Sequence, residues 1–266
     1  MRPLSARNPR ITRLAKLARR REERAAQRAF VVEGPVLVAV ALHAGAEVVD
    51  AYVDEEAAGR PAVAEVLDLL AARVDPWVVP AGTLDRVGDA VTSQGLLAVV
   101  RSPAPSWPEP ATTDLVVVLC DVGDPGNAGT IVRAAAASGA GAVVVVGGVD
   151  PTNPKVVRAS AGAVFGVDVV VAEAGAVEVL HRLGIAGYET LATVVDGAEA
   201  YDAVDLTGPV AVVVGNEAHG LPPAAAAAAH RAVSIPMAGP TESLNVAMAT
   251  TVVCFEALRQ RRAARA

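Results

Sequence analysis

The sequence predicts an α/β protein made of two domains, and three observations lead to this. The chain has 266 residues, 53% of them apolar, which is enough to bury a sizeable core. Short β-rich apolar runs alternate with helical segments along its length. One segment interrupts the alternation, because residues 101–114 carry four prolines, which disfavour regular structure. We therefore expect an N-terminal domain over 1–102, a linker over 103–113 and a C-terminal domain over 114–266.

The N-terminal domain reads as a small α/β layer structure. Apolar residues with helical spacing, beginning at Ile11, Leu14 and Leu17, predict a helix over 11–28 with arginines on its other faces. Further helices are expected over 35–44 and 61–73. Extended segments are expected over 29–33, 48–53, 77–79 and 96–100.

The C-terminal domain alternates more regularly. Residues 115–120 form a continuous apolar run, as expected for a parallel strand buried on both faces. Further strands are predicted over 142–146, 167–171, 189–195, 210–214 and 233–236. Helices are predicted over 128–138, 154–162, 177–183, 224–230 and 243–262. This half therefore reads as a parallel-sheet α/β domain.

The charges are distributed unevenly. Residues 1–28 hold ten Lys or Arg against two Glu, a net charge of +8, so the rest of the chain sums to −14. A basic arm on an acidic body favours a polyanionic partner such as nucleic acid, although a solvated helix is the alternative. Aromatic residues make up only 3%, which argues against a platform that stacks single-stranded bases.

Composition also excludes several classes of protein. Two cysteines, Cys120 and Cys254, rule out a disulfide-stapled secreted scaffold, and both fall in predicted core elements. No uncharged run is long enough to span a membrane, and the N-terminus lacks the apolar segment of a signal peptide. We find no Walker loop, nucleophile elbow or metal-ligand cluster. The expectation is a cytoplasmic protein without a metal.

Three polar turns follow predicted strands, where open α/β sheets bind their ligands. The first, residues 121–133, contains Asn127 close to a helix N-terminus and Arg133 about 9 Å further along the helix axis. Helix capping is the alternative role for Asn127, and a surface or ion-paired arginine is the alternative for Arg133.

The second turn, residues 214–222, directly follows a valine strand, and its glycines allow a ligand to approach the backbone. Glu217 could bind a cationic or hydroxylated group, or could cap the segment after it. The third turn, residues 234–247, enters the last helix, which Thr241 or Ser243 could cap. Asn245 is a poor helix former there, so its amide is available to a ligand or a neighbouring loop.

In this order, the three turns resemble motifs 1, 2 and 3 of the SpoU/TrmH-type RNA 2′-O-ribose methyltransferases of the SPOUT superfamily. Asn127 and Arg133 match motif 1, residues 215–220 match motif 2, and residues 235–247 match motif 3. Residues 153–162 resemble the segment between motifs 1 and 2. Residues 8–10 and 30–34 are similar to the L30e-like substrate-binding domain often fused ahead of that catalytic domain.

The resemblance implies a SPOUT domain with a C-terminal trefoil knot, a homodimer, S-adenosylmethionine as cofactor and a structured RNA as substrate. It implies a catalytic set of Arg133, Asn127, Glu217, Ser243 and Asn245. It implies a cofactor-binding set of Thr193, Val194, Val195, Gly215, Asn216, Glu217, Gly220, Ile235, Met237, Ser243, Leu244 and Asn245. With the basic arm, it suggests RNA contacts at Arg10, Arg13, Lys16, Arg19, Arg20, Arg133 and Arg158.

Methylation of ribosomal RNA, most simply 23S rRNA, is the function that this reading favours. Arg133 is expected to hold the neighbouring phosphate and stabilise the developing alkoxide, with phosphate or water taking the proton. Three alternatives remain open: a transfer-RNA methyltransferase, a non-catalytic RNA-binding paralogue, and a small-molecule α/β enzyme. A methyltransferase binds S-adenosylmethionine and a non-catalytic paralogue does not, so binding of this cofactor separates the two. A protein that does not bind RNA would favour the small-molecule enzyme.

Overall fold

The computed structural model describes residues 1–88 and 93–265, and the chain divides into two compact units. The N-terminal unit comprises Met1–Ala104 together with Thr152–Phe165, and the C-terminal unit comprises Pro105–Pro151 and Gly166–Ala266. The chain therefore passes from one unit to the other three times. Trp107 of the proline-rich segment belongs to the C-terminal unit, where the Arg182 guanidinium lies 3.8 Å from its ring centroid.

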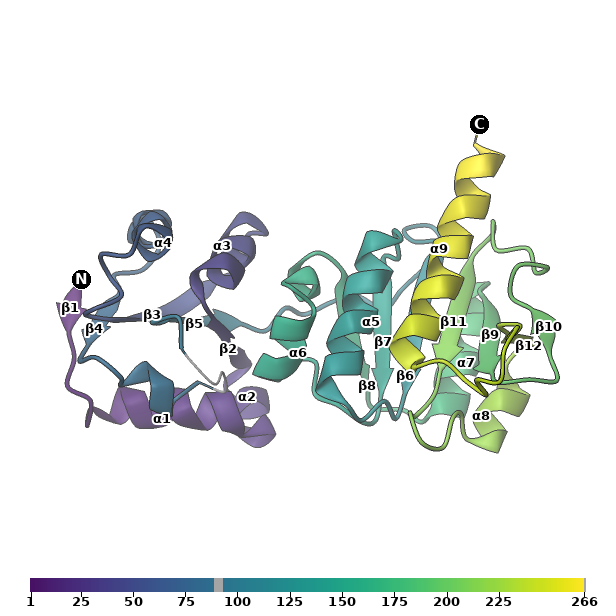
Figure 1. The fold of residues 1–266 in the computed structure, drawn as a ribbon, viewed down its shortest axis with the longest axis horizontal. Helices are drawn as coiled ribbons and strands as arrows, with labels where there is room; N and C mark the ends of the chain where they lie inside the picture. The colour runs from purple at the N-terminus through teal and green to yellow at the C-terminus, as the bar shows by residue number, and fades with distance from the viewer. Residues whose placement is uncertain (89–92, 266) are drawn as a thin grey trace. The chain divides into compact units, whose positions relative to one another are not determined.

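The N-terminal unit has a five-stranded mixed sheet in the order β1-β4-β3-β5-β2, in which β5 runs antiparallel to β2 and β3. Its strands are β1 (Arg2–Pro3), β2 (Ala29–Glu33), β3 (Val48–Asp54), β4 (Trp77–Val79) and β5 (Leu96–Arg101). Its helices include α1 (Pro9–Arg19), α2 (Arg21–Gln27), α3 (Pro35–His43), α4 (Pro61–Ala71) and the 3₁₀ turn η1 (Leu84–Arg86). Helices α1 and α2 lie on one side of the sheet, and α3 and α4 on the other (Figure 1).

The single helix predicted over 11–28 is two helices, which corrects the sequence-based expectation. Arg20 adopts extended backbone angles (φ −117°, ψ 120°) and separates α1 from α2. The buried Arg24 guanidinium stabilises this break by donating to the carbonyls of Leu17 (3.0 Å) and Ala18 (3.4 Å), which end α1. Leu14 and Leu17 are buried in the core of the unit, so this basic segment is part of the fold and not a loose arm.

Residues 152–165 lie in the C-terminal half of the sequence but pack in the N-terminal unit. This segment contains α6 (Pro154–Ala159) and the 3₁₀ turn η2 (Ala163–Phe165), and α6 packs against β2. The ring of Phe165 stacks on Phe30 of β2, with centroids 5.9 Å apart and planes 16° apart. Arg158 donates to the buried carboxylate of Glu33 at 3.4 Å. The alternation of strands and helices in the sequence does not indicate that residues 152–165 pack in the N-terminal unit.

The C-terminal unit is a seven-stranded, entirely parallel sheet in the order β10-β12-β9-β11-β6-β7-β8. The strands are β6 (Leu115–Cys120), β7 (Ala142–Val146), β8 (Asp168–Ala172), β9 (Glu189–Val194), β10 (Glu199–Ala200), β11 (Val210–Val214) and β12 (Arg231–Ser234). The helices are α5 (Pro125–Ala137), α7 (Ala176–Ala186), α8 (Pro223–Ala228) and α9 (Val246–Ala264). Helices α5 and α9 pack together, and α7 packs with α8 behind the sheet (Figure 1).

The predicted α/β class and parallel sheet are confirmed. The strands predicted over 115–120, 142–146 and 210–214 have the observed bounds, because uninterrupted Val and Leu runs mark strands buried on both faces. The last helix begins at Val246 and not at residue 243. Cys120 and Cys254 are buried free thiols, and burial raises the pKa of each to about 12. The trefoil knot stays a prediction.

Candidate active site

The three polar turns meet at the carboxyl edge of the parallel sheet. Residues 121–124 follow β6, residues 215–222 follow β11, and residues 235–245 follow β12. Strands β6, β11, β9 and β12 are consecutive neighbours in the sheet. Because parallel strands all end on the same edge, the order of the strands brings segments about 90 residues apart in the sequence into contact.

Glu217 joins the second turn to the first. Its carboxylate accepts hydrogen bonds from the backbone N–H groups of Gly123 and Asp124, both at 3.1 Å, and from the Asn127 side-chain amide at 2.9 Å. Burial acts to raise the pKa of Glu217, but the hydrogen bonds together outweigh it and lower that pKa. Asn216 adds a parallel link by donating to the Asp121 carbonyl at 2.9 Å.

Asn127 does not cap its helix, so the capping alternative is wrong. Asp124 is the N-cap of α5, and its carboxylate accepts from the Asn127 N–H at 2.8 Å, with Pro125 as the first helical residue. This leaves the Asn127 side chain free to donate to Glu217. The Asp-Pro pair was the sequence signal for this cap. Glu217 likewise does not cap the segment after it, but holds the loop that leads into α5.

Asn245 joins the third turn to the first. Its side-chain oxygen caps α9 by accepting from the N–H groups of Ala247 (2.9 Å) and Met248 (3.3 Å). Its side-chain nitrogen donates to the Asn127 oxygen at 2.9 Å. Neither Thr241 nor Ser243 caps this helix, in contrast to the expectation. Asn127, Glu217 and Asn245 therefore form one chain of hydrogen bonds across all three turns, which we call the loop network.

A pocket of about 450 Å³ opens beside the loop network, within the size range of small-molecule sites. It is lined by the ends of β9, β11 and β12, by the second and third turns, and by the first turns of α9. All of the predicted cofactor-binding residues except Asn245 line it: Thr193, Val194, Val195, Gly215, Asn216, Glu217, Gly220, Ile235, Met237, Ser243 and Leu244. The pattern did not single out His219 or Glu242, which also line it.

Gly215 is the point in this pocket where no other residue fits. A Cβ atom there would lie 2.2 Å from the Gly220 carbonyl carbon and 2.3 Å from the Leu221 nitrogen, both backbone atoms that cannot move aside. The turn closes this tightly because Asn216 and Gly220 pair through backbone hydrogen bonds of 3.0 and 2.8 Å. The result is a wall of the pocket made of main chain.

Arg133 and Ser243 are the two members of the predicted catalytic set outside the loop network. Arg133 is exposed on α5 and does not line the pocket, whereas Ser243 does. Within residues 1–88 and 93–265, neither side chain has a hydrogen-bonding or ionic partner. Both are therefore available to a bound molecule.

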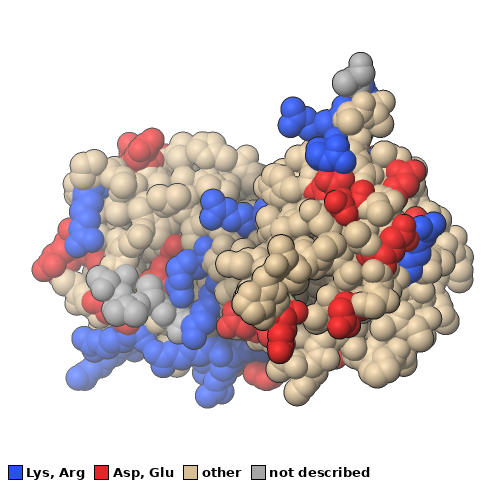
Figure 2. All heavy atoms as spheres, turned by 45° about the vertical axis from the view of Figure 1, so that its right-hand side comes forward, with Lys and Arg blue, Asp and Glu red and all other residues tan. Residues whose placement is uncertain are grey.

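The predicted RNA contacts of the N-terminal unit already have protein partners in most cases. Arg10 and Arg13 lie 3.3 and 3.6 Å from the nearly buried Asp50 carboxylate. Lys16 lies 3.8 Å from Glu23, and Arg19 donates to the Arg86 carbonyl. Arg20 is exposed. Figure 2 shows Lys and Arg side chains gathered on one side of the N-terminal unit and again at the end of the C-terminal helix.

The fold and site together define a class of protein: a parallel α/β domain with a main-chain-walled pocket at its carboxyl edge, attached to a smaller basic α/β domain. The model of the SpoU rRNA methylase family matches residues 114–255, and that of the MRM3-like substrate-binding domain matches residues 8–98. The chain belongs to the SpoU rRNA methylase family. The sequence-based recognition of this family is thereby confirmed.

Related sequences and solved structures are similar to this chain over most of its length. An uncharacterised tRNA/rRNA methyltransferase of Synechocystis is 34% identical over 74% of this chain and 72% of its own. A 23S rRNA (guanosine-2′-O-)-methyltransferase of Xanthomonas axonopodis is 37% identical over 71% and 79%. The SpoU methyltransferase AviRb of Streptomyces viridochromogenes, solved in complex with AdoMet, is 30% identical, with a TM-score of 0.85 over 96% and 99%.

Among the described residues, no group of three His, Cys, Asp or Glu side chains is arranged to hold a metal ion. None of the described helices is long and apolar enough to cross a membrane.

Proposed function

We propose that this protein transfers a methyl group from S-adenosylmethionine to a ribose 2′-hydroxyl of ribosomal RNA. The observation that carries the proposal is the loop network, which ties all three family motifs together at the edge of one pocket. Relatives named as 23S rRNA 2′-O-methyltransferases support the choice of ribosomal RNA. Two solved tRNA-modifying relatives match over only 57% of this chain, which favours tRNA less.

The pocket fits S-adenosylmethionine in size and chemistry. Main chain around Gly215 and apolar side chains such as Ile235 and Leu244 suit an adenosine, and exposed Glu242 suits a cationic group. When bound, this cofactor supplies an electrophilic methyl group on a sulfonium. Thr193, which also lines the pocket, is fixed by donating to the Val213 carbonyl at 2.9 Å. The predicted cofactor-binding residues that line the pocket are retained on these grounds, and Asn245 is assigned to the loop network.

The loop network offers hydrogen-bond donors and no base. The Glu217 carboxylate is occupied by three donors, and the side-chain oxygens of Asn127 and Asn245 each already accept. What remains free is one N–H on each Asn side chain. Donors placed in this way orient a ribose oxygen and stabilise the charge that develops on it.

Arg133 completes the proposed catalytic set. An arginine side chain stays protonated in proteins, so it serves as a phosphate clamp and not as the proton acceptor. With Glu217 occupied as well, the 2′-hydroxyl proton passes to the RNA phosphate or to water. The remaining RNA contacts, Arg158 included, are assigned to the N-terminal unit, whose basic side chains suit a phosphate backbone.

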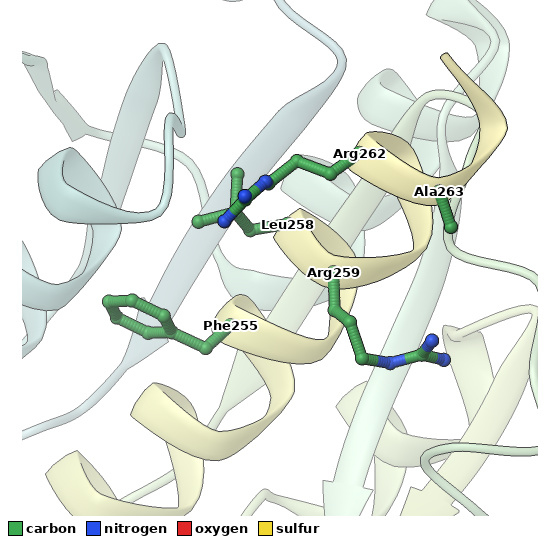
Figure 3. A pocket seen from close by; sticks show the side chains of 5 residues that line it. All are labelled: Phe255, Leu258, Arg259, Arg262 and Ala263. Carbon is green, nitrogen blue, oxygen red and sulfur yellow. The ribbon is translucent and has the colours of Figure 1, made fainter. Parts of the chain in front are cut away.

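We also infer that the protein acts as a homodimer whose second copy covers an apolar stripe on α9. Met248 and Phe255 are seven residues apart on one face of that helix and remain 63% and 43% exposed. Figure 3 shows Phe255 and Leu258 projecting from α9 into the same hollow. Side chains of this size left exposed in register on a helix favour a partner surface.

The test is transfer of tritium from labelled S-adenosylmethionine to ribosomal and transfer RNA that lack the modification, followed by alkaline digestion. We expect label in an alkali-resistant dinucleotide from 23S rRNA, and its loss with Arg133→Ala. Label in the transfer-RNA fraction would contradict the choice of substrate. A chain that binds RNA but not S-adenosylmethionine would be the non-catalytic paralogue, and indifference to RNA would favour a small-molecule enzyme.

A further inference from the structure

The C-terminal unit is strongly acidic except at the end of its last helix. Its residues before Val246 include fifteen Asp or Glu against three Arg, a net charge of −12. From Val246 onward, four arginines face a single glutamate, a net charge of +3. Figure 2 shows blue side chains gathered at this end, directly next to red side chains of the same unit. The acidic part of the unit repels RNA, whereas the basic end of the last helix attracts it.

The ion pairs of this unit show which arginines are available. Arg182 lies over the ring of Trp107, and Arg231 pairs with Glu189 and Glu199. Arg259 pairs with Glu256 at 2.7 Å. In the part of this unit that the structure describes, the guanidiniums without a protein partner are those of Arg133, Arg262 and Arg265. Arg133 is already assigned to the catalytic set, which leaves two at the end of α9.

These two arginines line a formed hollow of about 320 Å³. Arg262 lies between this hollow and the one beside Phe255 and Leu258, because it lines both (Figure 3). Arg261, between them in sequence, is fixed by donating to the carbonyls of Leu206 (3.0 Å), Gly208 (2.9 Å) and Asp114 (3.0 Å), which anchors this end of the helix. The same hollow is also lined by the polar residues Thr112 and Ser138 and by the acidic Asp114. An anchored helix end with two unpaired guanidiniums beside a polar hollow is suited to bind a phosphodiester.

We propose that Arg262 and Arg265 form a second contact for the RNA backbone, at the opposite end of the helix that begins at the active site. This inference rests on the proposed function, since it takes its partner to be the RNA substrate. Seventeen residues separate Asn245 from Arg262, which is about 25 Å along the helix axis. A contact so far from the methylated ribose belongs to a neighbouring segment of a structured RNA. It adds affinity without adding to the chemistry.

The experiment measures binding of the full chain to in-vitro transcribed 23S rRNA over a salt series. The Arg262→Gln/Arg265→Gln variant is compared with wild type and with Arg259→Gln, which removes a paired arginine from the same helix. Loss of two phosphate contacts should reduce the slope of log K against log salt by about 1.4 to 1.8. The ratio of the association constants of wild type and the double variant should then be about tenfold larger at 50 mM salt than at 200 mM salt.

We expect the double variant to keep S-adenosylmethionine binding and kcat at saturating RNA, and to raise only KM for RNA, with Arg259→Gln close to wild type. A double variant with unchanged salt slope and KM would overturn the inference while the proposed function stands. A shift of the double variant from dimer to monomer in sedimentation would also overturn it, because these arginines would then serve the subunit interface. Wild type that neither binds nor methylates this RNA would overturn both proposals.

Discussion

At the scale of single residues, Asn245 has two separable roles. One atom of its side chain caps α9 and another donates to Asn127, so a substitution that keeps one role and removes the other is informative. Aspartate caps a helix as well as asparagine does. A carboxylate oxygen in place of the amide nitrogen would, however, face the Asn127 oxygen. Rotating the Asn127 amide would only move that conflict to Glu217.

Asn245→Asp should therefore be less destabilising than Asn245→Ala, because it keeps the helix cap, and should lower methyl transfer ten- to hundredfold, since misplaced orienting groups cost about that much. Asn245→Ala removes the cap as well and should cost about 1 kcal/mol of stability. Thermal unfolding and single-turnover methyl transfer measure the two effects. Equal activity of Asn245→Asp and wild type would show that the link to Asn127 has no catalytic role.

Glu217 gives a pH-dependent prediction. Because its pKa is lowered in the folded protein, it contributes stability above its unfolded pKa of about 4.5, and that stability is lost as the pH falls through the folded pKa. Glu217→Gln should therefore be less stable than wild type at pH 7, by about 1 kcal/mol given its exposure. The difference should shrink as the pH falls below about 4.5. Denaturant unfolding at pH 7 and pH 4 tests this, and a difference that is constant with pH would contradict it.

At the scale of elements, residues 152–165 are the segment whose position in the fold the sequence does not predict. The family model that spans 114–255 runs through it, yet α6 and η2 are part of the N-terminal unit. The contacts that hold it there, Phe165 on Phe30 and Arg158 on Glu33, both involve β2. A substitution in this segment is therefore expected to change the stability of the N-terminal unit.

Phe165→Ala should destabilise the N-terminal unit by about 2 kcal/mol, since the ring is partly buried and stacked on another aromatic. Hydrogen exchange should accelerate in β2 and remain unchanged in β6. Phe165→Leu, which keeps an apolar side chain but loses the ring pair, should show a smaller effect. Faster exchange in β6 with β2 unaffected would contradict the assignment of this segment.

At the scale of the whole molecule, the exposed apolar stripe on α9 is the surface at which we expect two copies of the chain to form a dimer. Phe255→Glu places a charge in the proposed subunit interface, so we expect a monomer in sedimentation and a loss of methyl transfer. Ile185→Glu is the matched control, because Ile185 is 90% exposed on α7, outside the proposed interface. The Ile185→Glu variant should remain dimeric and active. A Phe255→Glu variant that stays dimeric would place the interface elsewhere.

The structure also changes the interpretation of the basic N-terminal segment, residues 1–28. Charge counting treats residues 1–28 as an arm, but Leu14 and Leu17 lie in the core of the N-terminal unit, and Arg24 is buried. Deleting the segment would unfold that unit and would not isolate an RNA contact. Individual exposed arginines such as Arg20 are the informative positions.

The sequence by itself determined the α/β class, the family and the strands of the parallel core. Each of these depends on local apolar periodicity or on residues within one turn, which can be followed along the chain. It did not determine that Asp124 frees Asn127 from capping, that Glu217 holds a loop about 90 residues away, or that residues 152–165 join the N-terminal unit. Only the tertiary structure decided these, because the order of strands in a parallel sheet differs from their order in the chain. That order sets which polar side chains meet.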